Sequence, residues 1–392
     1  MTKRKLWLGA AFLFVAGDGM AMQSRGALLS SFEATFGVSE SLLGLVAPAG
    51  TLGFVLAIVA VGLAAGRLNV RITLLLGVVA MVLTMFALVV APLYSVFLLA
   101  LLAQGAAAGV FRGLDRPVLS HIYPDRLGRI FVLYALAWSI GAVSGPLLVS
   151  GVLWIAERSP AIAAVPIDEW RLTYLLLALW FLPVIAILWK LDAPTSWDET
   201  ELDWTALKRL LEKPAIRGAL LGMALVGGIE GAMFTWLPYY AGTFLERDLA
   251  NASLSIFLVA YVPGRYVYSR LVETGAYLGI SLVTAGLAIP TIAFALSGRI
   301  GVWMLVAVFA TGMLLSSLFP MLSAYGVEAA PAYSGPVSAL TTAATYLGIA
   351  TVPTVMGVVA DVRTIQDAMW IPIGLTVVLV AVIAATRMRS TV

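Results

Sequence analysis

The feature that most limits the fold of this chain is a succession of long apolar segments that runs from Leu6 to Ala385. Each segment is close to the roughly 20 residues that an α-helix needs to cross about 30 Å of hydrocarbon. Hydrophobic residues make up 61% of the 392 positions and charged residues only 11%, which is outside the usual range of water-soluble domains. The pattern therefore predicts an all-α membrane protein that crosses the bilayer many times.

The apolar segments predict twelve transmembrane helices, six in each half of the chain. The first six are predicted over Leu6–Phe32, Ser41–Ala65, Arg71–Val90, Tyr94–Ser120, Leu127–Leu153 and Trp170–Trp189. The second six are predicted over Ala215–Phe244, Ser253–Ser269, Ala276–Leu296, Val302–Tyr325, Gly335–Ala360 and Ala368–Ala385.

A polar stretch separates the two halves. Within it, Asp203–Glu212 places its tryptophan and leucines in the pattern of an amphipathic helix at a membrane surface. We expect an N-terminal six-helix bundle over residues 1–191, a cytoplasmic linker over 192–213 and a C-terminal six-helix bundle over 214–392.

The two halves share an internal repeat. In both, an acidic residue followed by glycine precedes a phenylalanine by fourteen positions, and a glycine precedes a proline by five. The first-half residues Asp18, Phe32, Gly141 and Pro146 match Glu230, Phe244, Gly348 and Pro353. Parallel six-helix repeats with a solute site between them are typical of secondary transporters.

Basic residues gather in every second connection between the predicted helices. They are Lys3, Arg4, Lys5, Arg67, Arg71, Arg126, Arg129, Lys208, Arg209, Lys213, Arg217, Arg265, Arg270, Arg387 and Arg389. Because cytoplasmic loops are rich in lysine and arginine, both termini are predicted to be cytoplasmic. We expect a multi-pass protein of the cell membrane.

The connection after the second predicted helix reads Gly62-Leu-Ala-Ala-Gly66-Arg67-Leu-Asn69-Val-Arg71. It resembles the cytoplasmic signature loop of the major facilitator superfamily, in which a glycine and two basic residues correspond to Gly62, Arg67 and Arg71. The chain departs from that loop at Gly66, where the family has aspartate, and at Asn69, where it has glycine. The resemblance implies two six-helix bundles related by a pseudo-two-fold axis and transport by alternating access.

Three further segments resemble the fucose-proton symporter group of this superfamily. They are Gly228–Tyr240 in the seventh predicted helix, Gly109–Asp115 in the fourth and Trp138–Pro146 in the fifth. The chain departs from the group at Leu119, where an asparagine is expected. This resemblance favours proton-coupled symport of a small polar solute, such as a sugar or an organic anion.

The alternative is a proton-coupled antiporter that exports drugs or metabolites. Gln104-Gly105 matches part of a fourth-helix motif of drug-proton antiporters, but the arginine position of that motif holds Leu101. Gly141–Pro146 also resembles the fifth-helix antiporter signature. The sequence leaves symport, antiport and pH-independent uniport open.

Acidic residues inside the predicted helices are the candidates for coupling transport to protons. A charge in a membrane helix costs roughly 2.5–3.5 kcal/mol on insertion scales, so such residues mark ion paths or paired sites. Asp18, Asp115 and Glu230 are the coupling candidates. The alternative is that each carboxylate only forms a structural pair with an arginine.

Polar and aromatic residues of the same helices are the candidates for solute binding. The planar guanidinium group of arginine can hold a carboxylate or sugar hydroxyls, and aromatic rings can stack on a sugar face. The candidates are Gln23, Arg25, Gln104, Arg112, Trp138, Phe234, Trp236 and Tyr240. Packing within the bundle is the alternative for the aromatic residues.

Glycines, prolines and basic residues near the helix ends are the candidates for gating. Prolines bend membrane helices, and basic residues of the signature loops can form contacts that change with conformation. The gating candidates are Gly62, Arg67, Arg71, Gly141, Pro146, Arg265 and Pro353.

Reactive residues are scarce in this sequence. It has one histidine and no cysteine, and it has no Gly-x-x-x-x-Gly-Lys-Ser/Thr phosphate-binding loop. We therefore expect no enzyme activity, no metal or other cofactor and no nucleic-acid partner. The expected partners are a small-molecule substrate, protons and the lipid bilayer, with the chain acting as a monomer.

Overall fold

The computed structural model describes the chain in segments and divides it into two compact units. The described residues are 3–64, 68–123, 127–159, 168–191, 208, 210–272, 276–297, 301–330 and 334–390. Unit 1 comprises Met1–Val38 and Pro48–Thr200, and unit 2 comprises Ser39–Ala47 and Glu201–Val392. Most of the predicted linker at 192–213 and the gating candidate Arg67 lie outside the described residues.

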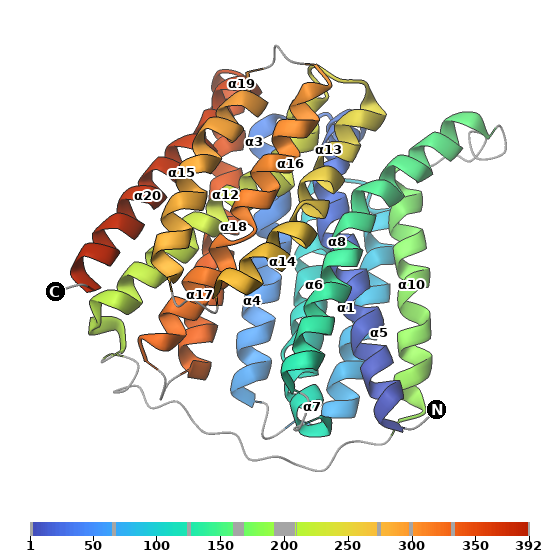
Figure 1. The fold of residues 1–392 in the computed structure, drawn as a ribbon. Coiled ribbons are helices and arrows are strands. Elements are labelled where there is room, and N and C mark those ends of the chain that lie inside the picture. Colours follow the sequence, from blue (N-terminus) through green and yellow to red (C-terminus); the bar gives the residue numbers. More distant parts are fainter. Residues whose placement is uncertain are drawn as a thin grey trace. The chain divides into compact units, whose positions relative to one another are not determined.

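Unit 1 is a helical bundle in which α1 packs along α8 and α10, and α5 packs against α6 and α10 (Figure 1). The helices from the start of the chain to the linker are α1 (Lys3–Ala27), α2 (Leu29–Phe36), α3 (Glu40–Leu43), α4 (Val46–Ala64), α5 (Val70–Val90), α6 (Tyr94–Arg112), α7 (Asp115–Ile122), α8 (Leu127–Arg158) and α10 (Arg171–Trp189). Of these, α3 is assigned to unit 2.

Unit 2 is a second helical bundle, in which α12 packs along α18 and α20, and α15 packs against α16 and α20. Its remaining helices are α12 (Pro214–Ala241), α13 (Arg247–Val259), α14 (Tyr261–Val272), α15 (Tyr277–Ala295), α16 (Trp303–Leu315), α17 (Leu318–Glu328), α18 (Ser334–Val362), α19 (Ile365–Ala368) and α20 (Trp370–Ser390).

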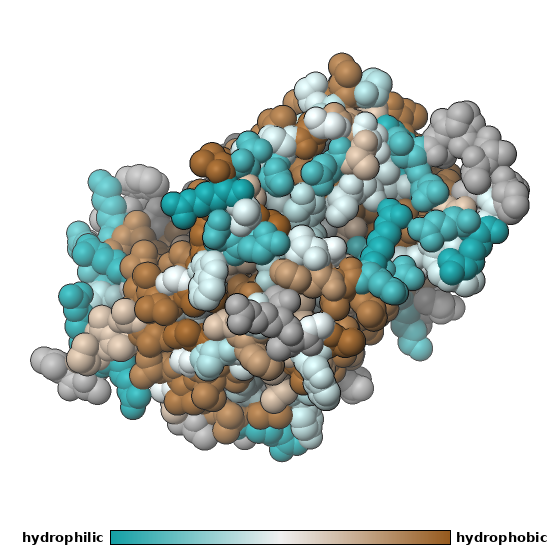
Figure 2. Space-filling model, turned by 90° about the horizontal axis from the view of Figure 1, so that it is seen from above, coloured by the Kyte–Doolittle hydropathy of each residue, from teal (hydrophilic) through white to brown (hydrophobic). Residues whose placement is uncertain are grey.

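Eleven helical segments in the described part of the chain are long and apolar enough to cross a membrane. The eighth predicted span, Ser253–Ser269, is instead divided at Ala260 into α13 and α14. With 13 and 12 residues, neither α13 nor α14 is long enough alone to cross a membrane, and the two together cover the eighth predicted span. Many large apolar side chains are exposed, among them Val90 at 72%. Figure 2 shows brown apolar areas between hydrophilic ones on the face seen from above. Such a surface needs lipid around it.

The repeated glycines permit very close helix contacts in both units. A Cβ atom at Gly141 of α8 would collide with the backbone oxygen of Ala16 in α1. In unit 2, a Cβ atom at Gly348 of α18 would collide with the backbone oxygen of Ala224 in α12. Small residues allow backbones to approach in this way inside membranes.

The segment Ser39–Ala47 packs within unit 2 although it precedes α4 in the chain. The hydroxyl of Ser41 donates to Oδ2 of Asp361 at 2.6 Å. The hydroxyl of Thr354 donates to the carbonyl oxygen of Gly44 at 3.1 Å. The predicted span Ser41–Ala65 therefore consists of α3, packed in unit 2, and α4, which continues in unit 1 from Pro48.

Candidate functional site

A break between α6 and α7 brings two charged residues of the fourth predicted span together. The helix ends at Arg112, Gly113 follows as its C-cap, and α7 begins at Asp115. Pro117 lies in the first turn of α7, where its missing N–H group is tolerated, whereas it would break the hydrogen bonds of a continuous helix. The sequence predicted one uninterrupted helix over Tyr94–Ser120, and the break corrects that prediction.

Arg112 lies between two buried carboxylates in unit 1. Its Nη1 donates to Oδ2 of Asp18 at 2.6 Å, and its Nε lies 3.7 Å from Oδ2 of Asp115. The hydroxyl of Tyr134 in α8 donates to the same Oδ2 of Asp115. We call these four residues the Arg112 network. It joins two coupling candidates and one solute-binding candidate.

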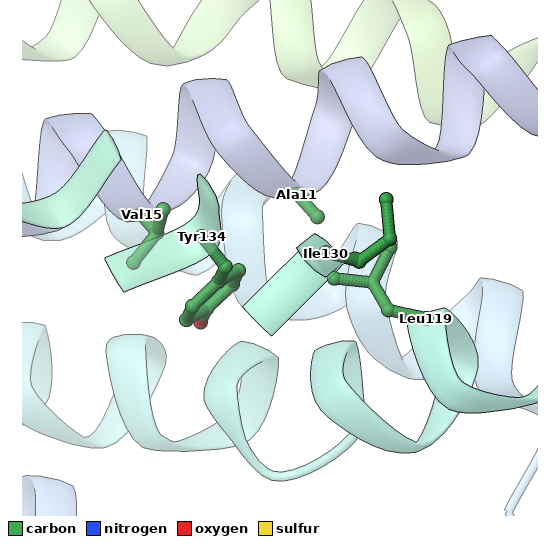
Figure 3. Close-up of a cluster of buried hydrophobic side chains, with 5 residues drawn as sticks. All are labelled: Ala11, Val15, Leu119, Ile130 and Tyr134. Atoms are coloured by element: carbon green, nitrogen blue, oxygen red, sulfur yellow. The ribbon is translucent and has the colours of Figure 1, made fainter. Parts of the chain in front are cut away.

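Apolar side chains surround the tyrosine of this network. Ala11 and Val15 of α1, Leu119 of α7 and Ile130 of α8 form a buried cluster with the ring of Tyr134 (Figure 3). Asp115 is 1% exposed and Asp18 is 8% exposed. Within the Arg112 network, two carboxylates therefore share one guanidinium group in a region with little access to water.

Two further candidates of unit 1, Arg25 and Gln104, bind each other. Nη2 of Arg25 donates to Oε1 of Gln104, and Nε2 of Gln104 lies 3.5 Å from the sulfur of Met81. A side chain at Gly50 would collide with the guanidinium group of Arg25, so the glycine makes room for it. The Nε of Arg25 has no partner among the described residues.

Gln23 stands apart from both groups. Its side chain is buried, with 1% exposure, and neither atom of its amide group has a hydrogen-bond partner among the described residues. Buried polar groups of this kind are usually hydrogen-bonded, so an unpaired amide indicates a place for water or a ligand.

The third coupling candidate, Glu230, lies in α12 of unit 2. The hydroxyl of Tyr261 in α14 donates to Oε1 of Glu230 at 2.9 Å. The guanidinium carbon of Arg265 lies 5.2 Å from the centre of the Tyr261 ring. Glu230 thus has a tyrosine donor, as Asp115 does, and the gating candidate Arg265 lies next to that donor.

The aromatic candidates differ in their surroundings. Nε1 of Trp236 donates to the carbonyl oxygen of Pro353 at 3.0 Å, and the hydroxyl of Tyr240 donates to that of Leu296 at 2.7 Å. Both side chains are almost fully buried. Phe234 packs edge-to-face against Phe257, and Trp138 packs beside the apolar cluster of Figure 3. The structure thus supplies packing partners for all four rings.

The remaining gating candidates lie at helix ends and inside helices. Gly62 lies near the end of α4, while Pro146 and Pro353 lie inside α8 and α18. Arg71 joins α5 to α10, because its Nη2 donates to the carbonyl oxygen of Trp189 at 2.6 Å.

Sequence reasoning missed Tyr134 and Tyr261 as partners of the coupling candidates. Both are tyrosines inside predicted spans, and a buried tyrosine hydroxyl needs a hydrogen-bond partner. That requirement could have pointed to these two tyrosines as hydrogen-bond donors. Tyrosines are also common as packing residues, however, and the sequence does not show which carboxylate lies within reach of each hydroxyl.

Comparison with known proteins identifies the family. The model of the Major Facilitator Superfamily matches residues 8–353, whereas a comparison with curated proteins finds no match. A bacterial homolog of the human lysosomal transporter Spinster is 15% identical, with 99% of this chain and 98% of that chain covered and a TM-score of 0.79.

Two other solved structures share the fold. The nucleoside transporter NupG is 14% identical, with 98% of this chain and 99% of that chain covered and a TM-score of 0.77. The D-xylose-proton symporter is 16% identical, with 97% of both chains covered and a TM-score of 0.76. At these identities the likeness shows the fold alone. The family match over most of its length, together with its twelve-span helical fold, shows that this chain belongs to the major facilitator superfamily.

Proposed function

We propose that this transporter imports a small polar solute together with protons by alternating access. The observation that carries the proposal is the Arg112 network, in which two buried carboxylates share one guanidinium group. One proton on Asp18 or Asp115 would balance the charge of the network. The network then has a neutral and a negative form, as a proton-coupled cycle requires.

Proton binding to a carboxylate of the network would change the ion pairs that Arg112 forms. A protonated carboxyl attracts the guanidinium group less strongly, so protonation of Asp18 would release the contact between α1 and α6. In unit 2, Glu230 would supply a further carboxyl for proton binding, and the hydroxyl of Tyr261 donates a hydrogen bond to it. We propose that both take part in coupling and that Arg112 transmits the change between helices.

We assign solute binding to buried polar atoms that have no hydrogen-bond partner among the described residues. Gln23 offers two amide donors and one acceptor oxygen, which suits the hydroxyl groups of a sugar-like solute. Arg25 keeps one unpaired N–H group beside Gln104. Among the neighbours in fold, two are named as fucose and D-xylose proton symporters, which supports a sugar-like solute and proton coupling.

Purified protein in liposomes with a trapped pH-sensitive dye tests the proposal. Sugars, nucleosides, organic acids and cationic drugs are added outside in turn. We expect one polar solute to acidify the lumen as protons enter with it. Alkalinisation of the lumen would instead show antiport, and transport without a pH change would contradict proton coupling.

Variants in the same liposomes test the residues. Asp18→Asn and Glu230→Gln are expected to abolish accumulation against a gradient but to leave exchange of internal for external solute intact. Glu157→Gln, an exposed carboxylate paired with Arg158, is the matched control and should accumulate normally. Full accumulation in both Asp18→Asn and Glu230→Gln would contradict the assignment of these carboxyls to coupling.

A further inference from the structure

Unit 2 contains a cavity of about 580 Å³ that the transport proposal does not use. It lies between the first turns of α12, the end of α17 and the last turns of α20. All three helices belong to the spanning segments, and each ends near this cavity. The cavity therefore lies where the apolar part of the protein meets water, on the side predicted to be cytoplasmic.

The polar end of the cavity is positively charged. Arg217 and Arg389 line it, and no acidic residue is among the described residues that do. Nε of Arg217 donates to the carbonyl oxygen of Leu211 at 2.6 Å, which fixes the side chain. Its two Nη groups, and the whole guanidinium group of Arg389, have no side-chain or backbone acceptor among the described residues. Both arginines are exposed, and two guanidinium groups at one cavity suit an anionic ligand.

The start of α12 adds a second feature that favours an anion. Pro214 is the first residue of the helix, and the preceding Lys213 makes no capping hydrogen bond with its side chain. The backbone N–H group of Ala215, which also lines the cavity, therefore lies at an uncapped helix N-terminus. Such N–H groups bind phosphate oxygens when basic side chains lie nearby.

Apart from the two arginines and the hydroxyl groups of Tyr325 and Thr386, the side chains that line the cavity are apolar. Leu221, Val382 and Ala385 lie further along α12 and α20, toward the spanning part of both helices. Leu221 is 56% exposed, as expected of a side chain that contacts lipid. A soluble phosphate compound would leave this apolar part of the cavity unused, whereas the acyl chains of a lipid would cover it.

We propose that this cavity binds an anionic phospholipid, with its phosphate between Arg217 and Arg389 and its acyl chains along Leu221 and Val382. Basic pockets between membrane helices on the cytoplasmic side bind anionic headgroups. The site is independent of the solute that the protein transports.

Native mass spectrometry of the full-length protein in detergent tests this site. Dioleoyl phosphatidylglycerol and dioleoyl phosphatidylcholine are added separately to the wild type and to the double variant Arg217→Gln/Arg389→Gln. We expect the variant to bind phosphatidylglycerol about tenfold or more weakly, since each basic residue contributes about 1 kcal/mol near an anionic surface. Binding of phosphatidylcholine should not change.

The double variant Arg158→Gln/Arg363→Gln is the matched control, because it removes two exposed arginines that do not line the cavity and lie at the C-terminal ends of α8 and α18. An equal loss of phosphatidylglycerol binding in both double variants would contradict the proposed site, since binding would then depend only on the net charge of the protein. Val382→Trp fills the cavity without a change of charge and should also weaken phosphatidylglycerol binding. If sn-glycerol 3-phosphate competes as well as the lipid does, the ligand is a soluble phosphate ester and the lipid proposal is wrong.

Discussion

Arg112 balances the charge of two buried carboxylates in unit 1. It is the cation that the described structure places within ion-pair distance of Asp18 and Asp115, both of them buried. Removal of one partner from a buried ionic group leaves an uncompensated charge, which costs far more than the pair itself contributes. Loss of the arginine would leave two such charges and is therefore more harmful than loss of either carboxylate.

We predict that Arg112→Gln lowers the free energy of unfolding by about 3–5 kcal/mol at neutral pH. Unfolding of the purified protein in mixed micelles, followed by circular dichroism at neutral pH, measures this loss. Arg158→Gln, in an exposed ion pair, should change stability little.

Tyr261 is the donor to Glu230 in unit 2. We predict that Tyr261→Phe destabilises the protein by about 1.5–3 kcal/mol, because a hydrogen bond to a charged group is lost while the ring is kept. The same unfolding assay measures the effect. Tyr266→Phe, which changes a largely exposed residue of the same helix, is the control. Equal stability of the two variants would show that the hydroxyl of Tyr261 does not hold the carboxylate.

At the scale of helices, close contact of backbones holds each bundle together. In a membrane there is no hydrophobic force between helices, so packing and small residues take its place. Gly141 lies where α8 touches α1, and Gly348 lies where α18 touches α12. The internal repeat of the sequence thus coincides with the same kind of contact in both units.

We predict that Gly141→Ala lowers stability by about 1–3 kcal/mol, because its methyl group would push against the backbone of Ala16. Gly151→Ala is the matched control in the same helix, since no atom lies within 4 Å of a Cβ atom built there. That control should be neutral or slightly stabilising, because alanine favours a helix. Thermal unfolding in detergent compares the two, and an unaffected Gly141→Ala would show that α1 and α8 can separate without cost.

At the scale of the whole molecule, the distribution of basic residues sets the orientation in the membrane. The chain contains no cysteine, so single cysteines can report which side each connection faces. We predict that Gln366→Cys is labelled by a membrane-impermeant maleimide in intact cells, whereas Lys213→Cys is labelled only after the cells are permeabilised. Both positions are exposed, which makes their reactivity comparable. The reverse pattern would place both termini outside.

The sequence by itself determined the membrane class, the twelve spans and the family, because hydropathy and charge placement depend only on the order of residues. It also selected Asp18, Asp115, Glu230 and Arg112, since a charge inside an apolar span is conspicuous wherever the helices pack. Most helix bounds followed from the same pattern. The breaks after Arg112 and at Ala260 were missed, because a short irregular turn hardly changes the hydropathy of its segment.

Only the tertiary structure decided which of these residues are partners. Arg112 and Asp18 are 94 positions apart, and Tyr134 reaches Asp115 from another helix. Such pairs depend on how the helices rotate and cross, which local periodicity does not specify. The same holds for Arg25 and Gln104, which bind each other, and for Ser39–Ala47, which packs in unit 2. The sequence names the polar groups in a span, and the packing of helices decides which of them meet.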